Sequence, residues 1–175
     1  IDCTHAISGC SQCSPYRASL LTGLYPLRHG VLVNDATLSP QHASIAQVFK
    51  THGYKTAYIG KWHLGDDAWY PTAQGYDENR GGCDYGQPPS YFDPFNQPKG
   101  RHETLREGIY ALPGREKGQY LSDREADEAV ALIRQWKDEP FFIQLAHYAV
   151  HTPIQAPADK AAAFEQEGKT AVQAR

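Results

Sequence analysis

The chain has 175 residues, of which 41% are hydrophobic and 21% charged, and its formal net charge is -3. This composition is typical of a globular domain that can bury a core. The small negative charge gives no electrostatic reason to bind nucleic acid, and no apolar run approaches the roughly 20 residues that span a bilayer. We therefore expect no nucleic-acid partner and no membrane span.

The first third of the chain predicts two helices followed by a strand. A short helix is expected over 15–22, because Pro15 suits a first helical turn and Gly23 can end the helix. A second helix is expected over 41–52, where apolar residues follow helical spacing. The strand 54–60 comes directly afterwards, and such short joints are typical of α/β proteins.

The region 65–118 has no clear period and is rich in Gly, Pro, Asn and Asp. A loop of this length inside a compact domain is usually functional, disordered or a small subdomain. Its aromatic residues argue against disorder. We therefore expect a long irregular insertion that shapes a pocket, with these aromatic residues inside it: Tyr85, Tyr91, Phe92 and Phe95.

A second helix–strand unit follows. Ser122 and Glu125 fit a capping box that begins a helix, and Pro140 ends it. The run 141–146 predicts a buried strand, and a last helix is expected at about 158–167, ending near Gly168. One face of the first of these helices is expected to be formed by Ala126, Ala129, Val130, Ile133 and Trp136.

Loops that leave the two predicted strands both carry histidine. Ligands of open α/β sheets bind beyond the carboxyl ends of the strands, so these loops are candidate site segments. The first loop carries Lys61 and His63, which point the same way in an extended segment. The second carries His147 and His151. We prefer His151 because Pro153 and Pro157, in the segment HYAVHTPIQAP, stiffen its surroundings.

Cys13 lies at the predicted start of the first helix, where free N–H groups and the helix dipole favour negative charge. Arg17 lies one turn further along. Together they can lower the pKa of a thiol or hold an oxyanion. The alternative interpretation of these two residues is a buried structural cysteine with a surface arginine.

Two possible metal motifs are present. Cys10 and Cys13 form C-x-x-C, so a zinc site is one alternative, with the ligands Cys3, His5, Cys10 and Cys13. Asp66 and Asp67 are adjacent acids, which point in opposite directions in an extended chain, and we expect them to be solvated loop residues.

Several segments together resemble the sulfatase family. CSPYRASLLTG, from Cys13 to Gly23, resembles the first sulfatase signature, C-x-P-x-R followed by Thr-Gly. GYKTAYIGKWHLG resembles the second signature, and PFFIQLAHYAVHTPIQAP resembles the later segment with a histidine in H-x-P. GYDENRGG and YLSDREADEAVALI resemble intervening segments. The likeness covers nearly the whole chain.

The resemblance implies an α/β fold, the alkaline-phosphatase/sulfatase-like sandwich with a mostly parallel central sheet, here incomplete at both ends. All 175 residues would belong to one sulfatase catalytic domain. The implied activity is hydrolysis of sulfate esters through a formylglycine made from Cys13. Arg17 would hold that side chain, and Lys61 would contact both it and the sulfate. His63 would take a proton from the second diol hydroxyl, and His151 would bind sulfate and assist the leaving alcohol.

The family also implies a divalent metal, usually calcium, or another such as magnesium. Residue 13, as formylglycine, would be one ligand. The family's Asp-Asp pair before the cysteine and its later Asp-Asn or Asp-His pair have no match here, so the other ligands are expected outside this chain. We therefore expect the 175-residue segment alone to be inactive.

The expected partners are a small-molecule or carbohydrate sulfate ester and a formylglycine-generating maturation enzyme. The family resemblance implies a periplasmic, secreted or lysosomal location. Alternatives are a phosphoesterase or phosphonate hydrolase of the same superfamily, an inactive fragment, or the zinc module on Cys3, His5, Cys10 and Cys13.

Overall fold

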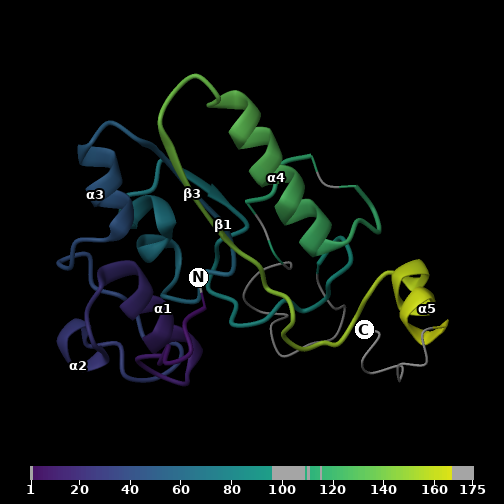
Figure 1. The fold of residues 1–175 in the computed structure, drawn as a ribbon, viewed down its shortest axis with the longest axis horizontal. Helices are drawn as coiled ribbons and strands as arrows, with labels where there is room; N and C mark the ends of the chain where they lie inside the picture. The colour runs from purple at the N-terminus through teal and green to yellow at the C-terminus, as the bar shows by residue number, and fades with distance from the viewer. Residues whose placement is uncertain (1, 96–108, 110, 115, 167–175) are drawn as a thin grey trace.

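The structure is a computed structural model that describes residues 2–95, 109, 111–114 and 116–166 (Figure 1). Helices and strands alternate along the chain, which confirms the α/β class. The elements are α1 (Cys13–Thr22), α2 (Pro26–His29), α3 (Ile45–Thr51), β1 (Lys55–Gly60), the 3₁₀ turns η1 (Asp67–Trp69) and η2 (Pro71–Gln74), β2 (Glu78–Arg80), α4 (Leu121–Gln135), β3 (Phe141–Ala146) and α5 (Ala158–Gln166).

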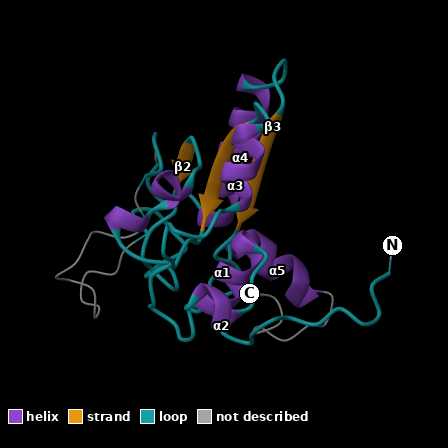
Figure 2. Ribbon diagram, turned by 90° about the vertical axis from the view of Figure 1, so that its left-hand side faces the viewer, coloured by secondary structure: helices purple, strands orange, loops and turns teal. Residues whose placement is uncertain are grey.

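The three strands form a parallel sheet in the order β2-β1-β3. Residues pair along the whole of β1 and β3, from Lys55 with Phe141 to Gly60 with Ala146. Both strands therefore end at the same edge of the sheet. Figure 2 shows their arrowheads pointing toward α1 and α2, so the helix that begins with Cys13 lies at the carboxyl ends of the strands.

Alternating side chains of β1 supply both faces of the sheet. Ala57 and Ile59 pack with α4 in one apolar cluster that also contains Leu132. Tyr58 belongs to a separate, larger cluster. On β3, Phe142 stacks against Phe49 of α3 with ring centroids 4.3 Å apart. Helices therefore cover both faces, which is the layering that a parallel sheet requires.

The start of α4 differs from the predicted capping box. The helix begins at Leu121, with Tyr120 at the N-cap position and no side-chain cap, so Ser122 lies inside the first turn. Leu121 is fully buried, and its N–H donates to the carbonyl of Tyr91 at 2.8 Å. This buried contact with the preceding irregular segment fixes where the helix begins, and Ser122 is not needed as a cap.

The buried face of α4 is also rotated from the predicted one. Ala129 and Trp136 are buried as expected, whereas the side chains of Ala126, Val130 and Ile133 are exposed. The buried row instead includes the two acids Glu125 and Glu128. These carboxylates have partners, His147 for Glu125 and Arg124 for Glu128, which allows polar groups to occupy a face that hydrophobicity alone would not assign to them.

Other boundaries shift by smaller amounts. The first helix starts at Cys13 itself, and α3 begins at Ile45 behind a capping box that Ser44 and Gln47 form. Strand β3 is half-buried rather than buried, and in the described part of the chain it pairs with β1 alone. Gly168, the expected end of the last helix, lies outside the described residues.

The irregular region contains the short strand β2, which the sequence did not predict. Of its aromatic side chains, Tyr85, Tyr91 and Phe95 are buried, in agreement with an ordered insertion. Its residues 96–108 lie outside the described part of the structure.

Candidate active site

Cys13 is the first residue of α1, a ten-residue helix, and so lies at the positive end of the helix dipole. The ammonium of Lys61, which follows β1 directly, donates a hydrogen bond to the sulfur of Cys13 at 3.3 Å. Lys61 is only 3% exposed. Burial is the main reason that its pKa is lowered; the nearby charge of Arg17 lowers it further, while Cys13 raises it.

Arg17 is held against the same loop. Its guanidinium donates to the hydroxyl of Tyr58 at 3.1 Å and to the backbone carbonyl of Lys61 at 2.6 Å. The Tyr58 hydroxyl donates to the same carbonyl at 2.5 Å. Arg17 thus fixes the backbone that carries Lys61, and its charge lies close enough to disfavour the charged form of Lys61.

His63 is buried and tied at one ring nitrogen. Its Nε2 lies 2.7 Å from a carboxylate oxygen of Asp35, and its Nδ1 is buried without a hydrogen-bond partner in the described structure. Burial lowers the pKa of His63 despite the opposing effect of Asp35. The ring is therefore neutral near pH 7, with the Nε2 proton directed to Asp35 and Nδ1 left as its basic atom.

The backbone around His63 is also held by α1. The Ser14 hydroxyl donates to the carbonyl of His63 at 2.8 Å, and the Ser14 N–H donates to the side-chain oxygen of Asn34 at 3.1 Å. Residues 13 and 14 therefore contact the loop after β1 at two points. These two contacts hold the start of α1 against the loop after β1, although the two segments are about 50 positions apart in sequence.

His151 lies in the loop after β3, and no hydrogen bond joins it to the other four predicted site residues in the described structure. Its carbonyl accepts a bond from the Tyr91 hydroxyl at 3.0 Å, and its backbone N–H donates to the carbonyl of Tyr148 at 3.1 Å. The ring nitrogen Nδ1 lies 3.2 Å from the Thr152 hydroxyl. The insertion thus holds the backbone of His151, and its ring contacts Thr152.

The described structure brings together Cys13, Arg17 and Lys61 and places His63 two residues beyond Lys61. Sequence reasoning missed two residues of this group, Tyr58 and Asp35. In the sequence Tyr58 is an aromatic residue within a predicted strand, and nothing in its local sequence indicates a contact with Arg17. Asp35 has a left-handed backbone (φ 63°), which Asn and Asp adopt more readily than most residues, but the sequence shows only an acid in a loop and gives no sign of its contact with His63.

Among residues 2–95, 109, 111–114 and 116–166, no group of three or more His, Cys, Asp or Glu lies together in a way that could hold a metal ion. All four cysteines are free thiols, and the zinc alternative on Cys3, His5, Cys10 and Cys13 gains no support from this arrangement. Asp66 and Asp67 are exposed, as expected for solvated acids. No described helix combines the length and the apolar character that a membrane crossing needs.

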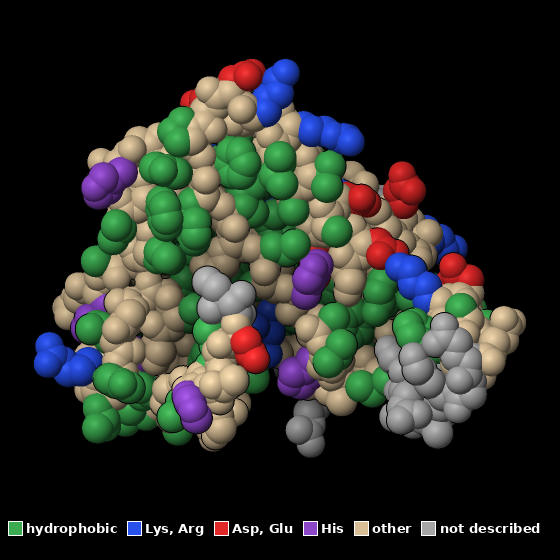
Figure 3. Space-filling view, in the orientation of Figure 1, with side chains coloured by type: hydrophobic (Ala, Val, Ile, Leu, Met, Phe, Trp, Pro, Cys, Tyr) green, Lys and Arg blue, Asp and Glu red, His purple; other side chains and the backbone are tan. Residues whose placement is uncertain are grey.

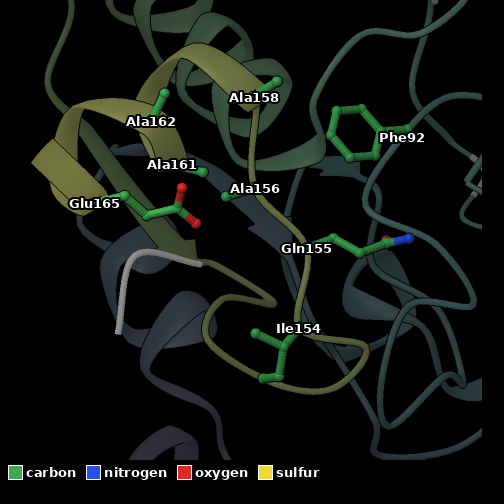
Figure 4. A pocket seen from close by; sticks show the side chains of 8 residues that line it. All are labelled: Phe92, Ile154, Gln155, Ala156, Ala158, Ala161, Ala162 and Glu165. Atoms are coloured by element: carbon green, nitrogen blue, oxygen red, sulfur yellow. The ribbon is translucent and has the colours of Figure 1, made fainter. Parts of the chain in front are cut away.

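Figure 3 shows a hollow near the centre of one face, where a recessed basic side chain lies between acidic and histidine side chains. A separate cavity of about 350 Å³ lies between α5 and the loop that follows His151 (Figure 4). None of the five predicted site residues lines it. The residues that line it are Phe92, Ile154, Gln155, Ala156, Ala158, Ala161, Ala162 and Glu165.

Comparison with known proteins identifies the family. The family model described as Sulfatase matches residues 3–174. The chain is 38% identical over 179 residues to arylsulfatase G of Mus musculus, a match that covers 82% of this chain and 33% of the relative. The chain therefore belongs to the sulfatase family.

Solved structures agree with this assignment and with the sandwich fold of the alkaline-phosphatase type. A crystal structure of Ps i-CgsB in complex with k-i-k-neocarrahexaose is 30% identical with a TM-score of 0.75, covering 93% of this chain and 40% of that one. A structure of BT4656 in complex with its substrate D-glucosamine-2-N,6-O-disulfate is 26% identical with a TM-score of 0.62, covering 87% and 28%. The chain spans about a third of the length of arylsulfatase G.

Proposed function

We propose that the protein to which this chain belongs hydrolyses sulfate esters, with a formylglycine made from Cys13 as its nucleophile. One observation carries the proposal: the Lys61 ammonium lies 3.3 Å from the sulfur of Cys13, at the N-terminus of α1. These two residues stand at matched positions of two separate sulfatase signatures. A lysine and a helix N-terminus that converge on one side chain suit a site where negative charge develops on sulfuryl oxygens.

The surroundings of Cys13 fit the modified residue. Sulfatases generally use a formylglycine and a divalent metal, and the hydrated aldehyde supplies an oxygen nucleophile. Lys61, now bonded to the sulfur, would donate to the side chain at position 13 and to a sulfate oxygen. Arg17 would orient Lys61 by its hydrogen bond to the backbone carbonyl of Lys61, and its guanidinium would add positive charge to the site. Charge-assisted bonds of this kind are about twice as strong as neutral ones.

His63 would act as the base that restores the aldehyde. Asp35 holds its Nε2 proton, so the unpartnered Nδ1 is the atom that can accept a proton from the second hydroxyl at position 13. The lowered pKa keeps the ring neutral and ready to accept. His151, in the loop after β3, would bind the substrate sulfate and assist the leaving alcohol.

The described residues do not supply a complete metal site. The side chain at position 13 would be this chain's contribution to calcium, or to another divalent cation such as magnesium. The remaining ligands would come from outside the chain. We also propose that residues 1–175 form part of one catalytic domain, which the shared apolar cluster from α1 to the loop after β3 supports.

The proposed substrate is a sulfate ester of a carbohydrate. This class is supported by the sulfated glucosamine that is bound by BT4656 and by the neocarrahexaose that is bound by Ps i-CgsB. A formylglycine-generating enzyme is the partner that the Cys13 modification requires. The two neighbours differ in the sugar they bind, so the proposal names the class and not one sugar.

The proposed function is tested in the full-length protein after conversion of Cys13. Lys61→Ala and His63→Ala should each lower turnover of 4-nitrophenyl sulfate by about 10²–10⁴, the range for a lost acid–base or oxyanion-type group. Asp66→Ala and Asp67→Ala are matched controls on the same loop, because both acids are exposed, and they should leave turnover unchanged.

Two outcomes contradict this proposal. Full activity of His63→Ala would show that the base is another residue. Faster hydrolysis of 4-nitrophenyl phosphate than of 4-nitrophenyl sulfate would favour the phosphoesterase alternative.

A further inference from the structure

The loop that carries His151 is tied to the irregular insertion by side-chain hydrogen bonds on both sides of the histidine. The Tyr91 hydroxyl donates to the carbonyl of His151 at 3.0 Å, and the Tyr91 N–H donates to the side-chain oxygen of Gln155 at 2.8 Å. Figure 4 shows the Gln155 side chain extending away from α5. The Thr152 hydroxyl donates to the side-chain oxygen of Gln87 at 3.1 Å. These bonds join residues that are 60 to 65 positions apart in sequence.

Tyr91 is well placed to hold the backbone of His151. Its side chain is 2% exposed, and its ring stacks on Tyr120 with ring centroids 5.8 Å apart. Burial raises the pKa of Tyr91 to about 12, so its hydroxyl keeps its hydrogen near neutral pH and acts as a donor. The Tyr120 hydroxyl donates to the carbonyl of Gln155 at 3.1 Å. The two tyrosines therefore hold the loop at His151 and again four residues later.

The contacts of the His151 ring indicate which of its nitrogens carries a hydrogen. Nδ1 lies 3.2 Å from the hydroxyl oxygen of Thr152 and 3.4 Å from the backbone carbonyl oxygen of Thr152. A carbonyl oxygen can only accept, and the Thr152 hydroxyl directs its single hydrogen to the Gln87 oxygen. Both neighbours of Nδ1 are therefore acceptors. A neutral His151 ring thus carries its hydrogen on Nδ1 and a lone pair on Nε2.

This tautomer suits the role that is proposed for His151. As the ester S–O bond breaks, its electron pair stays on the ester oxygen, which takes a proton from Nε2. The sulfuryl group passes to the attacking hydroxyl oxygen of residue 13, whose proton passes to water. The ring is left neutral with its remaining hydrogen on Nδ1. Because the Thr152 oxygen accepts that hydrogen before and after the transfer, the ring keeps its orientation while Nε2 gives up its proton.

We propose that the His151 ring is positioned by three hydrogen-bonding side chains, Tyr91, Thr152 and Gln87. Tyr91 holds the backbone of His151. Gln87 orients the Thr152 hydroxyl so that its oxygen accepts the Nδ1 hydrogen, which leaves Nε2 for the substrate. This inference rests on the proposed sulfate ester hydrolysis. It gives the insertion a role in the reaction, although the insertion contains none of the five predicted site residues.

The first test measures the tautomer of His151 and needs no substrate. Nuclear magnetic resonance of the full-length protein with ¹⁵N-labelled histidine is recorded on the alkaline side of the ring's titration, and His151→Gln identifies the signals by their loss. We expect the Nδ1–H form to predominate. Thr152→Val should shift the ratio toward Nε2–H by about 2–10-fold, the range for one lost hydrogen bond, and Thr152→Ser should restore it. A predominant Nε2–H form, or an unchanged ratio in Thr152→Val, would overturn the inference.

The second test measures turnover of phenyl sulfate by the full-length, converted protein. Thr152→Val and Tyr91→Phe should each lower kcat by about 2–10-fold, whereas Thr152→Ser should retain the activity of the unaltered protein. Thr51→Val is the matched control, because the Thr51 hydroxyl is also exposed and also lies beside a histidine ring nitrogen, 3.3 Å from His52. It should leave kcat unchanged.

A double-mutant comparison separates positioning of His151 from a general loss of structure. In a His151→Ala protein, Tyr91→Phe and Thr152→Val should lower kcat no further, since the ring that they position is gone. Equal losses with and without His151 would show a merely structural role and overturn the inference, as would full activity of both variants. Absence of turnover of every sulfate ester by the unaltered, converted protein would overturn the proposed function, and the tautomer measurement would still decide whether Thr152 orients the ring.

Discussion

Tyr58 provides a sharp test of the idea that a hydrogen-bond cluster positions the cations beside Cys13. Its hydroxyl donates to the Lys61 carbonyl at 2.5 Å and accepts from Arg17 at 3.1 Å, and its side chain is 1% exposed. Tyr58→Phe removes both bonds. The carbonyl keeps its bond from Arg17 at 2.6 Å, so no buried backbone group loses its last partner.

The expected effects follow from these contacts. Two hydrogen bonds at about 0.5–1.5 kcal/mol each predict a loss of about 1–3 kcal/mol in the free energy of unfolding. If a similar amount of energy positions Lys61 and Arg17 in the transition state, turnover should fall by about 5–150-fold, since 1.36 kcal/mol corresponds to a factor of ten.

A matched control is Tyr76→Phe. Tyr76 is 2% exposed, packs edge-to-face on Tyr58 and donates to the Gln144 side chain at 2.6 Å, but it makes no hydrogen bond to Lys61 or Arg17 in the described structure. Denaturant unfolding and hydrolysis of 4-nitrophenyl sulfate are measured for both variants of the full-length protein. Similar losses of stability with a loss of turnover only in Tyr58→Phe support the account. Equal turnover in the two variants refutes it.

Two further predictions concern the same loop. Asp35→Asn keeps the left-handed backbone but removes the charge that raises the pKa of His63. The acid limb of kcat should therefore move to lower pH and its plateau should fall by about 10-fold, because a weaker base accepts the proton when the aldehyde is restored. An unmoved acid limb in the measured pH–rate profile would contradict this role of Asp35. Gly60→Ala should lower the free energy of unfolding by more than about 3 kcal/mol, since its Cβ would lie 2.3 Å from the carbonyl oxygen of Ala146. The control is Gly53→Ala, which is also at positive φ but has open space around its Cβ. It should lower the free energy of unfolding by only about 1–2 kcal/mol. Equal losses for the two glycines in denaturant unfolding would show that the close approach of β1 and β3 does not limit this position.

The sequence predicts the frame of the site because the frame depends on local patterns. The helix that Cys13 begins, strand β1 and strand β3 are all marked by apolar spacing or by Gly and Pro at their ends. Two parallel strands then place their following loops at one edge, which is why Lys61 could be expected near a site from position alone.

The details that the sequence does not predict are contacts between distant segments. The Asp35 contact with His63 joins a loop after α2 to the end of β1, and no periodicity encodes it. Glu125 lies on the buried face of α4 although a hydrophobic pattern assigns acids to the solvent face. Its partner His147 comes from the other end of the second helix–strand unit. Pairing of buried polar groups is a tertiary property, so the rotation of α4 could be seen only in the folded structure.

The measurement that tests the central claim most directly is the chemical state of residue 13 in active, full-length protein. Mass spectrometry of the tryptic peptide that ends at Arg17 reports whether the Cys13 thiol has been replaced. We expect an aldehyde or its hydrate at this position, in proportion to the specific activity for sulfate esters, and no turnover in Cys13→Ala. Full sulfate ester turnover by a protein whose Cys13 remains an unmodified thiol would contradict the account.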